Sequence, residues 1–247
     1  MRILTVDLES SPHLAYTFQL RDVSIAPVQV VEPSRVLCFA AKWLDKPGMI
    51  FASEHHDGRE AMVQRIWQLL DEADVVVGWN TKSFDLKHFA REFTLAGLPP
   101  PSPWFDCDLL PLVRRRMRWA SNKLEHVADE LGIGRKVQHH GFRMWIDCLN
   151  GDDAAWTLFR KYCKHDVRLT EDVFVKLREL GWVDRLPHVG LYNDTHGSQC
   201  GACGSTDLMR RGYAYTSTSR YAQFQCKDCK RYSRASHADR RQYVRPV

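Results

Sequence analysis

Two acidic residues stand at the end of a strand-like segment near the N-terminus. Residues 3–6 are apolar and rich in β-branched side chains, which is typical of a buried strand, and Asp7 and Glu9 follow directly. Because side chains alternate along a strand, both carboxylates project from one face, about 7 Å apart. Like charges so placed repel each other unless a cation lies between them, usually a divalent metal ion. For an isolated pair, an ordinary polar strand end is the simpler interpretation.

A further acid, Asp85, follows a second strand-like segment. The apolar residues Val75, Val76 and Val77 precede Asn80, and Asp85 lies at the start of a helical pattern. Open α/β sheets collect functional groups at strand ends, and the positive end of a helix favours an anion there. The alternative, an ordinary charge in the first turn of a helix, is the simpler one for this residue alone.

Tyr162 and Asp166 are four residues apart in a helical pattern, so they share a helix face about one turn apart. The apolar residues of the pattern would face the sheet and place this pair along its edge: Val167, Leu169, Val173 and Leu177. The alternative is a surface acid beside a half-buried tyrosine. His165 points to another face and is interpreted as structural.

Taken together, these segments resemble the DEDD family of 3′–5′ exonucleases, which have a ribonuclease-H-like fold. The sequence 6–9 (Val-Asp-Leu-Glu) resembles the first family motif, Asn80-x3-Phe84-Asp85 the second, and Tyr162-x3-Asp166 the third, in the family's order. The tyrosine subclass, found in proofreading domains of family B DNA polymerases, is the most similar one. The histidine subclass would have His where this chain has Lys161. The resemblance covers about residues 1–180, including the helix opened by Lys-Leu-Glu at 123–125.

The resemblance implies a two-metal phosphodiester hydrolysis. Two Mg²⁺ or Mn²⁺ ions would be held by the four acids, and hard carboxylate oxygens suit these ions: Asp7, Glu9, Asp85 and Asp166. Tyr162 would orient the attacking water. Asn80 and Phe84 would lie near the substrate, although core packing is an equal alternative for Phe84. The expected activity is a 3′–5′ exonuclease on single-stranded nucleic acid or 3′ ends, with DNA favoured.

Two rival functions remain open at this point. The same metal pair could serve a structure-specific or endonucleolytic enzyme. From another class, the chain could be a nucleic-acid-binding protein with a vestigial nuclease fold, although the intact acids and Tyr162 argue against decay. The length leaves no room for a polymerase domain, so the chain resembles a stand-alone nuclease of a kind that bacteriophages often carry.

The elements that would position these residues form a mixed α/β sheet flanked by helices. Strands are predicted at 36–44, 49–53, 75–77 and 105–110, and helices at 58–73, 84–98, 123–131 and 153–180, the last as one helix or two. Asn122 with Glu125 three residues later predicts a helix start. Residues 11–33 are predicted to be a loop, and residues 134–151 a loop with some order. The arginines at 114–118 could follow a phosphate backbone, or form a solvated helix face.

Eight cysteines fall into two classes. Cys38, Cys107, Cys148 and Cys163 are single and are predicted to be small buried hydrophobic residues. The other four form two C-x-x-C pairs, a strong signal for one tetrahedral structural Zn²⁺ and a zinc ribbon: Cys200, Cys203, Cys226 and Cys229. Residues 212–217 and 221–225 alternate like a hairpin between the pairs. We predict domains at 1–182 and 199–247, with a linker at 183–198.

The positive charge is concentrated near the C-terminus. The chain carries +5 in total, of which residues 198–247 contribute +7 and residues 1–197 contribute −2. Aromatic rings interleaved with cations are typical of single-strand binding, although packing of the ribbon could account for about half of these rings. The predicted nucleic-acid contacts are Arg210, Arg211, Tyr213, Tyr215, Arg220 and Tyr221. No apolar run reaches the ~20 residues of a membrane span, so a cytoplasmic location is expected.

Overall fold

The computed structural model describes residues 2–135, 141–183, 186, 199–217 and 219–239. These divide into two compact units, Met1–Val173 and Phe174–Val247. The predicted boundaries at 182 and 199 remain a prediction, since most of the predicted linker lies outside the described residues. Within the described chain, no helix is both long and apolar enough to cross a membrane.

The first unit is built on a five-stranded sheet with the strand order β5-β4-β1-β6-β7. Strands β1, β6 and β7 run parallel, and β4 and β5 are antiparallel to their neighbours. The carboxyl ends of the three parallel strands therefore meet at one edge of the sheet. The strand bounds are β1 Ile3–Ser10, β4 Val36–Trp43, β5 Met49–Ser53, β6 Val75–Gly78 and β7 Phe105–Asp108.

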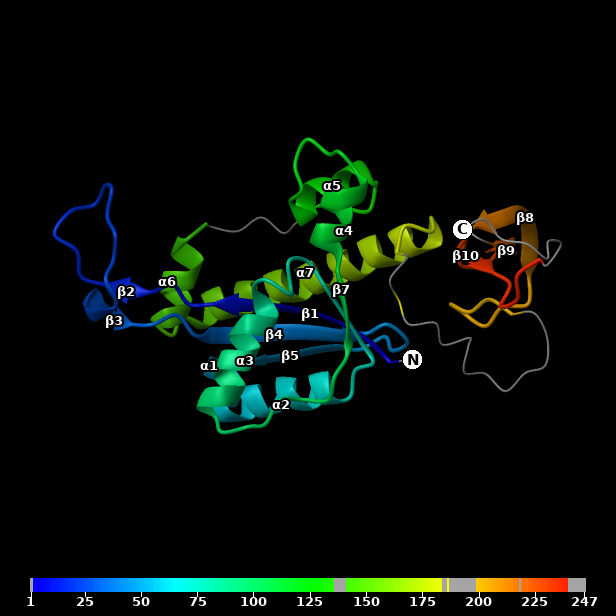
Figure 1. The fold of residues 1–247 in the computed structure, drawn as a ribbon. Coiled ribbons are helices and arrows are strands. Elements are labelled where there is room, and N and C mark those ends of the chain that lie inside the picture. The colour runs from blue at the N-terminus through cyan, green and yellow to red at the C-terminus, as the bar shows by residue number, and fades with distance from the viewer. Residues whose placement is uncertain (1, 136–140, 184–185, 187–198, 218, 240–247) are drawn as a thin grey trace. The chain divides into compact units, whose positions relative to one another are not determined.

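Helices cover both faces of this sheet (Figure 1). One face packs against α2 and α3 through side chains such as Met62 and Phe89, and the other packs against α6 and α7 through Met144, Trp156 and Phe159. The helix bounds are α1 Glu54–Asp57, α2 Arg59–Asp71, α3 Asp85–Leu95, α4 Leu109–Arg116, α5 Leu124–Glu130, α6 Arg143–Leu149 and α7 Asp153–Glu179. This mixed sheet between helical layers confirms the predicted fold class.

Three local predictions differ from the structure. The segment 134–151 contains helix α6, which was predicted as loop. The helix α5 begins at Leu124, one residue after the predicted start, and no side chain caps it, so the predicted capping by Asn122 is wrong. The predicted loop at 11–33 includes a short two-stranded arm, β2 Leu14–Ala15 and β3 Val30–Glu32, with the single 3₁₀ turn Pro27–Gln29. The segment 153–179 is one continuous helix.

The second unit contains a three-stranded antiparallel sheet of β8 Leu208–Tyr215, β9 Arg220–Cys226 and β10 Tyr232–Arg234, in the order β10-β9-β8. The β8–β9 hairpin was predicted, with shorter strands, and its register shifts between Arg210 and Tyr213.

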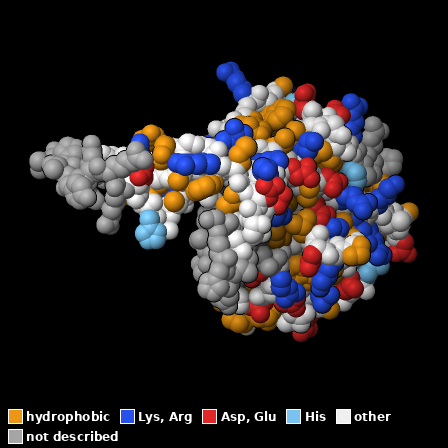
Figure 2. All heavy atoms as spheres, turned by 90° about the vertical axis from the view of Figure 1, so that its right-hand side faces the viewer, with side chains coloured by type: hydrophobic (Ala, Val, Ile, Leu, Met, Phe, Trp, Pro, Cys, Tyr) orange, Lys and Arg blue, Asp and Glu red, His pale blue; other side chains and the backbone are white. Residues whose placement is uncertain are grey.

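On the molecular face shown in Figure 2, Lys and Arg side chains are interspersed with Asp and Glu.

Candidate active site and cysteine cluster

The register of β1 decides where its two acids point. Leu4, Val6 and Leu8 belong to the core formed with α2 and α3. Because strand side chains alternate, Asp7 and Glu9 are directed to the opposite face, which is the face covered by α7. The hydrophobic side chains of β1 therefore fix the orientation of its carboxylates.

Helix α7 brings a third acid to this pair. The ligand oxygens of Asp7, Glu9 and Asp166 all lie within 4.8 Å of one another. Asp166 is only 3% exposed, and Tyr162, one turn earlier on the same helix, is also buried. The pair was expected along the edge of the sheet. In the structure both side chains are buried, and Asp166 lies beside the two acids of β1. Three carboxylates in so small a volume match the hard oxygen ligands of Mg²⁺ or Mn²⁺.

The carboxylate of Asp85 is hydrogen-bonded to the backbone of the same strand, β1. Its Oδ1 accepts a hydrogen bond of 3.0 Å from the N–H of Leu8, the residue between the two acids of β1. It is the first residue of α3 and is 3% exposed. Burial raises its pKa from 3.8 to about 7, and the N–H donor of Leu8 only partly opposes this. Asp85 lies beside the group of three acids without belonging to it.

A groove with a cavity volume of about 650 Å³ opens over Asp7, Tyr162 and Asp166, whereas Glu9 and Asp85 are not part of its lining. Its walls come from the turn after β6, from α4 and from the start of α5. Arg114 and Lys123 lie in the lining, so at least one arginine of the 114–118 cluster faces this groove. The full lining is Asp7, Trp79, Asn80, Leu110, Arg114, Ser121, Asn122, Lys123, Leu124, Glu125, Tyr162 and Asp166.

Sequence reasoning missed Asp108, which organises one wall of the groove. Its carboxylate accepts backbone N–H donors from Asn80 at 2.8 Å, Lys82 at 3.1 Å and Leu110 at 3.1 Å. Asn80 needs such support, because its φ of 68° lies in the left-handed region. Burial raises the pKa of Asp108. The one signal in the sequence is an acid at the end of a parallel strand beside β6.

Phe84 lies on the surface rather than in the core. Its side chain is 42% exposed, and its ring centroid lies 4.6 Å from that of His88. Of the two interpretations left open by the sequence, the structure therefore favours an accessible ring. His165 contacts the Arg135 backbone carbonyl at 2.7 Å, in agreement with a structural role.

Residues 32–178 match the RNase_H superfamily, which is more than half of the chain. The chain belongs to the RNase_H superfamily. The matched span includes α3 and the part of α7 that carries Tyr162 and Asp166, and it begins after β1. The predicted ribonuclease-H-like fold is thereby confirmed.

Among solved structures, the chain is similar to a family B DNA polymerase from the hyperthermophilic archaeon Pyrobaculum calidifontis. The TM-score is 0.55 at 20% sequence identity, and the match covers 73% of this chain and 25% of the polymerase. At this identity the likeness shows a shared fold, and this RNase_H superfamily chain corresponds to only a quarter of the polymerase. No curated protein matches it.

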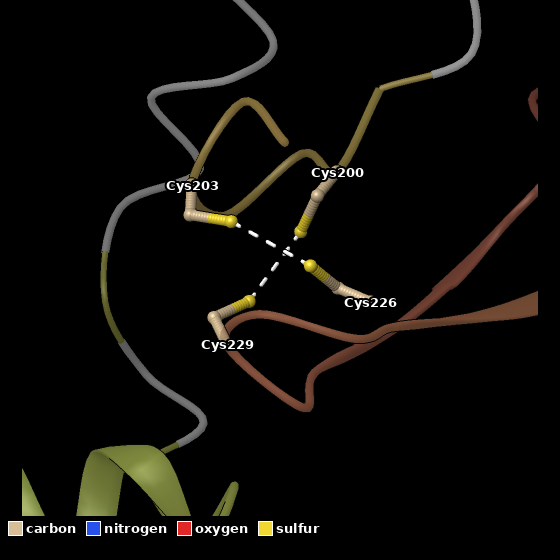
Figure 3. Close-up of side chains that lie close together, drawn as sticks. All are labelled: Cys200, Cys203, Cys226 and Cys229. Carbon is tan, nitrogen blue, oxygen red and sulfur yellow. Dashed lines mark hydrogen bonds between the residues drawn. The ribbon is translucent and has the colours of Figure 1, made fainter. Parts of the chain in front are cut away.

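The four paired cysteines of this RNase_H superfamily chain converge on one point (Figure 3). The Sγ atoms are 3.5 Å apart for Cys200 and Cys229, and 3.7 Å apart for Cys203 and Cys226. Zn–S bonds of about 2.3 Å in a tetrahedron would separate the sulfur atoms by about 3.8 Å. The four ligand atoms also form one group within 4.8 Å, so the residues fit a zinc ion.

The four single cysteines are all buried, which confirms their predicted character. Cys163 has an additional contact, since its Sγ lies 3.8 Å from the backbone oxygen of Asp7 and 4.0 Å from its Oδ2. Burial raises the pKa of the Cys163 thiol well above its ordinary value, so it stays protonated beside the acids.

The predicted nucleic-acid contacts of the ribbon are partly engaged with each other. The guanidinium groups of Arg210 and Arg220 lie 5.1 and 4.5 Å from the centroid of the Tyr213 ring. Arg234 lies 4.2 Å from the Tyr221 ring. Arg211 donates to Gln225 at 3.2 Å, whereas Tyr215 is 72% exposed. Among these aromatic residues, Tyr215 therefore has the most exposed ring.

Proposed function

We propose that the chain is a metal-dependent nuclease that removes nucleotides from the 3′ end of single-stranded nucleic acid, with DNA favoured. The observation that supports this is the convergence of the ligand oxygens of Asp7, Glu9 and Asp166 within 4.8 Å, with Asp7 and Asp166 lining an open groove. Asp166 lies 159 residues after Asp7 in the sequence. Three carboxylates gathered this closely repel one another unless a cation lies between them.

In this proposal, Asp7, Glu9 and Asp166 would hold two divalent cations. Asp85, which lies outside this group in the structure, would approach it to complete the ligand set. The bound ions would lower the pKa of the attacking water and stabilise the leaving oxygen. These acids fit divalent cations because their ligand atoms are all carboxylate oxygens and because the oxygens of Asp7, Glu9 and Asp166 lie within 4.8 Å of one another.

The side chains around the acids would bind and orient the substrate. The Tyr162 hydroxyl would position a water as a hydrogen-bonding group. Arg114 and Lys123 would neutralise phosphates in the groove that they line. Asn80 and the exposed ring of Phe84 would contact the terminal nucleotides.

In the second unit, we propose that Cys200, Cys203, Cys226 and Cys229 hold one structural Zn²⁺. A three-stranded sheet of this size has a small core, and zinc binding would supply most of its folding free energy. Tyr215 and the arginines of β8 and β9 would then support binding of a single strand.

Activity and polarity are tested together with labelled substrates. Single-stranded DNA and RNA carrying a 5′ or a 3′ label are incubated with and without Mg²⁺ or Mn²⁺, beside a circular single strand. We expect metal-dependent release of mononucleotides from the 3′ end and an intact circle. Cutting of the circle would establish an endonuclease instead. Binding without hydrolysis by pure protein would support the other alternative, a nucleic-acid-binding protein with a vestigial nuclease fold.

A further inference from the structure

A second groove lies along α7, with a cavity volume of about 460 Å³, and the proposed hydrolysis does not use it. The helix forms one wall, and β4, β5 and the turn between them form the other. Positive side chains dominate its lining, which contains Lys42, Pro47, Met49, Thr157, Arg160, Lys161, Lys164, His165 and Arg168.

This groove faces away from the candidate active site. Arg160, Lys164 and Arg168 repeat every four residues, so they form one stripe along the helix, about 6 Å apart. Tyr162 and Asp166 are offset from this stripe by two residues, which is about 200° around the helix axis. The same helix therefore presents its acid to one groove and its cations to another.

Among the described residues, four of the five Lys and Arg side chains in this groove are not neutralised by an acid. Lys42 pairs with Glu171 at 2.6 Å, and both side chains are largely buried. In contrast, Arg160, Lys161, Lys164 and Arg168 form no ion pair with any residue that the structure describes. Charge density is thus high here, although residues 1–197 together carry −2.

Packing holds two of these cations in place. Arg160 and Lys164 lie 5.4 and 5.8 Å from the centroid of the Phe51 ring on the edge strand β5. Partial burial, with the neighbouring charge of Arg160, lowers the pKa of Lys164. An anion bound between them would relieve this repulsion.

We propose that this basic groove binds the phosphate backbone of the substrate strand, away from its reacting end, through Arg160, Lys161, Lys164 and Arg168. The inference rests on the proposed function, which supplies a polynucleotide as the ligand. A linear row of cations one helical turn apart suits a polyanion with repeated charges, whereas a single anion would engage only one or two of them.

The test compares a charge-removing variant with a charge-retaining one at the same three exposed positions. The first is Arg160→Gln/Lys161→Gln/Arg168→Gln, and the second is Arg160→Lys/Lys161→Arg/Arg168→Lys. Binding of a 30-nucleotide single strand is measured by fluorescence anisotropy across a salt series, without added divalent cation. Hydrolysis of a tetranucleotide in Mn²⁺ is measured in parallel.

The glutamine variant should bind the long strand about tenfold more weakly, and its log–log salt slope should fall by about 2, since each phosphate contact on a single strand contributes about 0.7. The charge-retaining variant should behave as the wild type. All three proteins should cleave the tetranucleotide at similar rates, because none of the substituted side chains lines the groove over the acids. Equal affinities and slopes for all three would overturn the inference, and so would an equal loss in both variants.

The same experiment distinguishes failure of the proposed nuclease function from failure of the inference about the basic groove. If the wild type hydrolyses neither substrate, the nuclease proposal fails. The salt slopes of the binding measurements still decide whether the basic groove binds a polynucleotide.

Discussion

The carboxylate of Asp85 is fixed to the backbone N–H of Leu8 at 3.0 Å, between the two acids of the first strand. This bond joins the start of α3 to the part of β1 that carries the candidate metal ligands. It also explains how a carboxyl group can be 3% exposed at this position, since the N–H satisfies one of its oxygens.

Asp85→Asn should stabilise the metal-free protein at high pH. The folded-state pKa of about 7 exceeds the ordinary 3.8, so the folded chain binds this proton more tightly than the unfolded chain. That contribution to stability is fully present below about pH 4 and is lost as the pH rises through 7. The amide can still accept from Leu8 and carries no buried charge. Thermal unfolding at pH 5 and pH 8 should therefore show a gain in Tm over the wild type, on the order of 5 °C, that is larger at pH 8.

Asp85→Ala is the matched control for this prediction. It also removes the charge, but it leaves the buried N–H of Leu8 without its acceptor, so it should lower Tm at both pH values. Mn²⁺ should raise the Tm of the wild type more than that of either variant. A Tm of Asp85→Asn below that of the wild type at pH 8 would contradict the burial argument.

Tyr162→Phe should show whether the Tyr162 hydroxyl orients a water, because the substitution removes the hydroxyl and keeps the packing of the ring. The ring lies against Trp145, with centroids 6.3 Å apart, and the phenylalanine ring preserves this contact. Loss of the hydroxyl should lower kcat about 10- to 100-fold, with KM and Tm nearly unchanged. Steady-state kinetics on a short oligonucleotide would measure the effect. A rise in KM at unchanged kcat would instead place Tyr162 in substrate binding alone.

The sequence predicted the residues whose positions depend on local periodicity. The alternation in β1 sets the direction of Asp7 and Glu9, and the spacing of four in α7 sets that of Tyr162 and Asp166. Both patterns are properties of a single element, so they can be identified without a structure.

Asp108 could not be identified in this way. Its role depends on the pairing of β7 with β6, which sets Asp108 beside Gly78 and brings the following turn within reach of its carboxylate. Helix α6 was missed for a related reason. It spans only seven residues, and its buried Met144 and Cys148 pack on β4 and α7 rather than forming a long apolar stripe. Tertiary contacts stabilise both features.

Asp108→Ala should lower the stability of the fold and disturb the wall of the groove that contains Asn80. The carboxylate accepts three backbone N–H groups, and losing it leaves Asn80, Lys82 and Leu110 without this acceptor. We expect a loss of about 2 to 4 kcal/mol in the free energy of unfolding, measured by urea denaturation. Asp108→Asn should lose less, because its amide oxygen can keep the Asn80 and Leu110 bonds. Equal losses in the two variants would show that the charge, rather than the acceptor geometry, is what matters.

Removing zinc should unfold the second unit and leave the first intact. Cys226 ends β9, its N–H donates to the Arg231 carbonyl at 2.9 Å, and its Sγ lies in the group of four. Cys226→Ser should therefore reduce bound Zn²⁺ from one ion per chain, measured by atomic emission, and expose the segment 199–239 to proteolysis. Hydrolysis of short oligonucleotides should persist, and affinity for long strands should fall. Cys148→Ser, at a buried single cysteine, should keep its zinc. A Cys226→Ser protein that is well folded throughout yet wholly inactive on short substrates would contradict the proposed division between the two units.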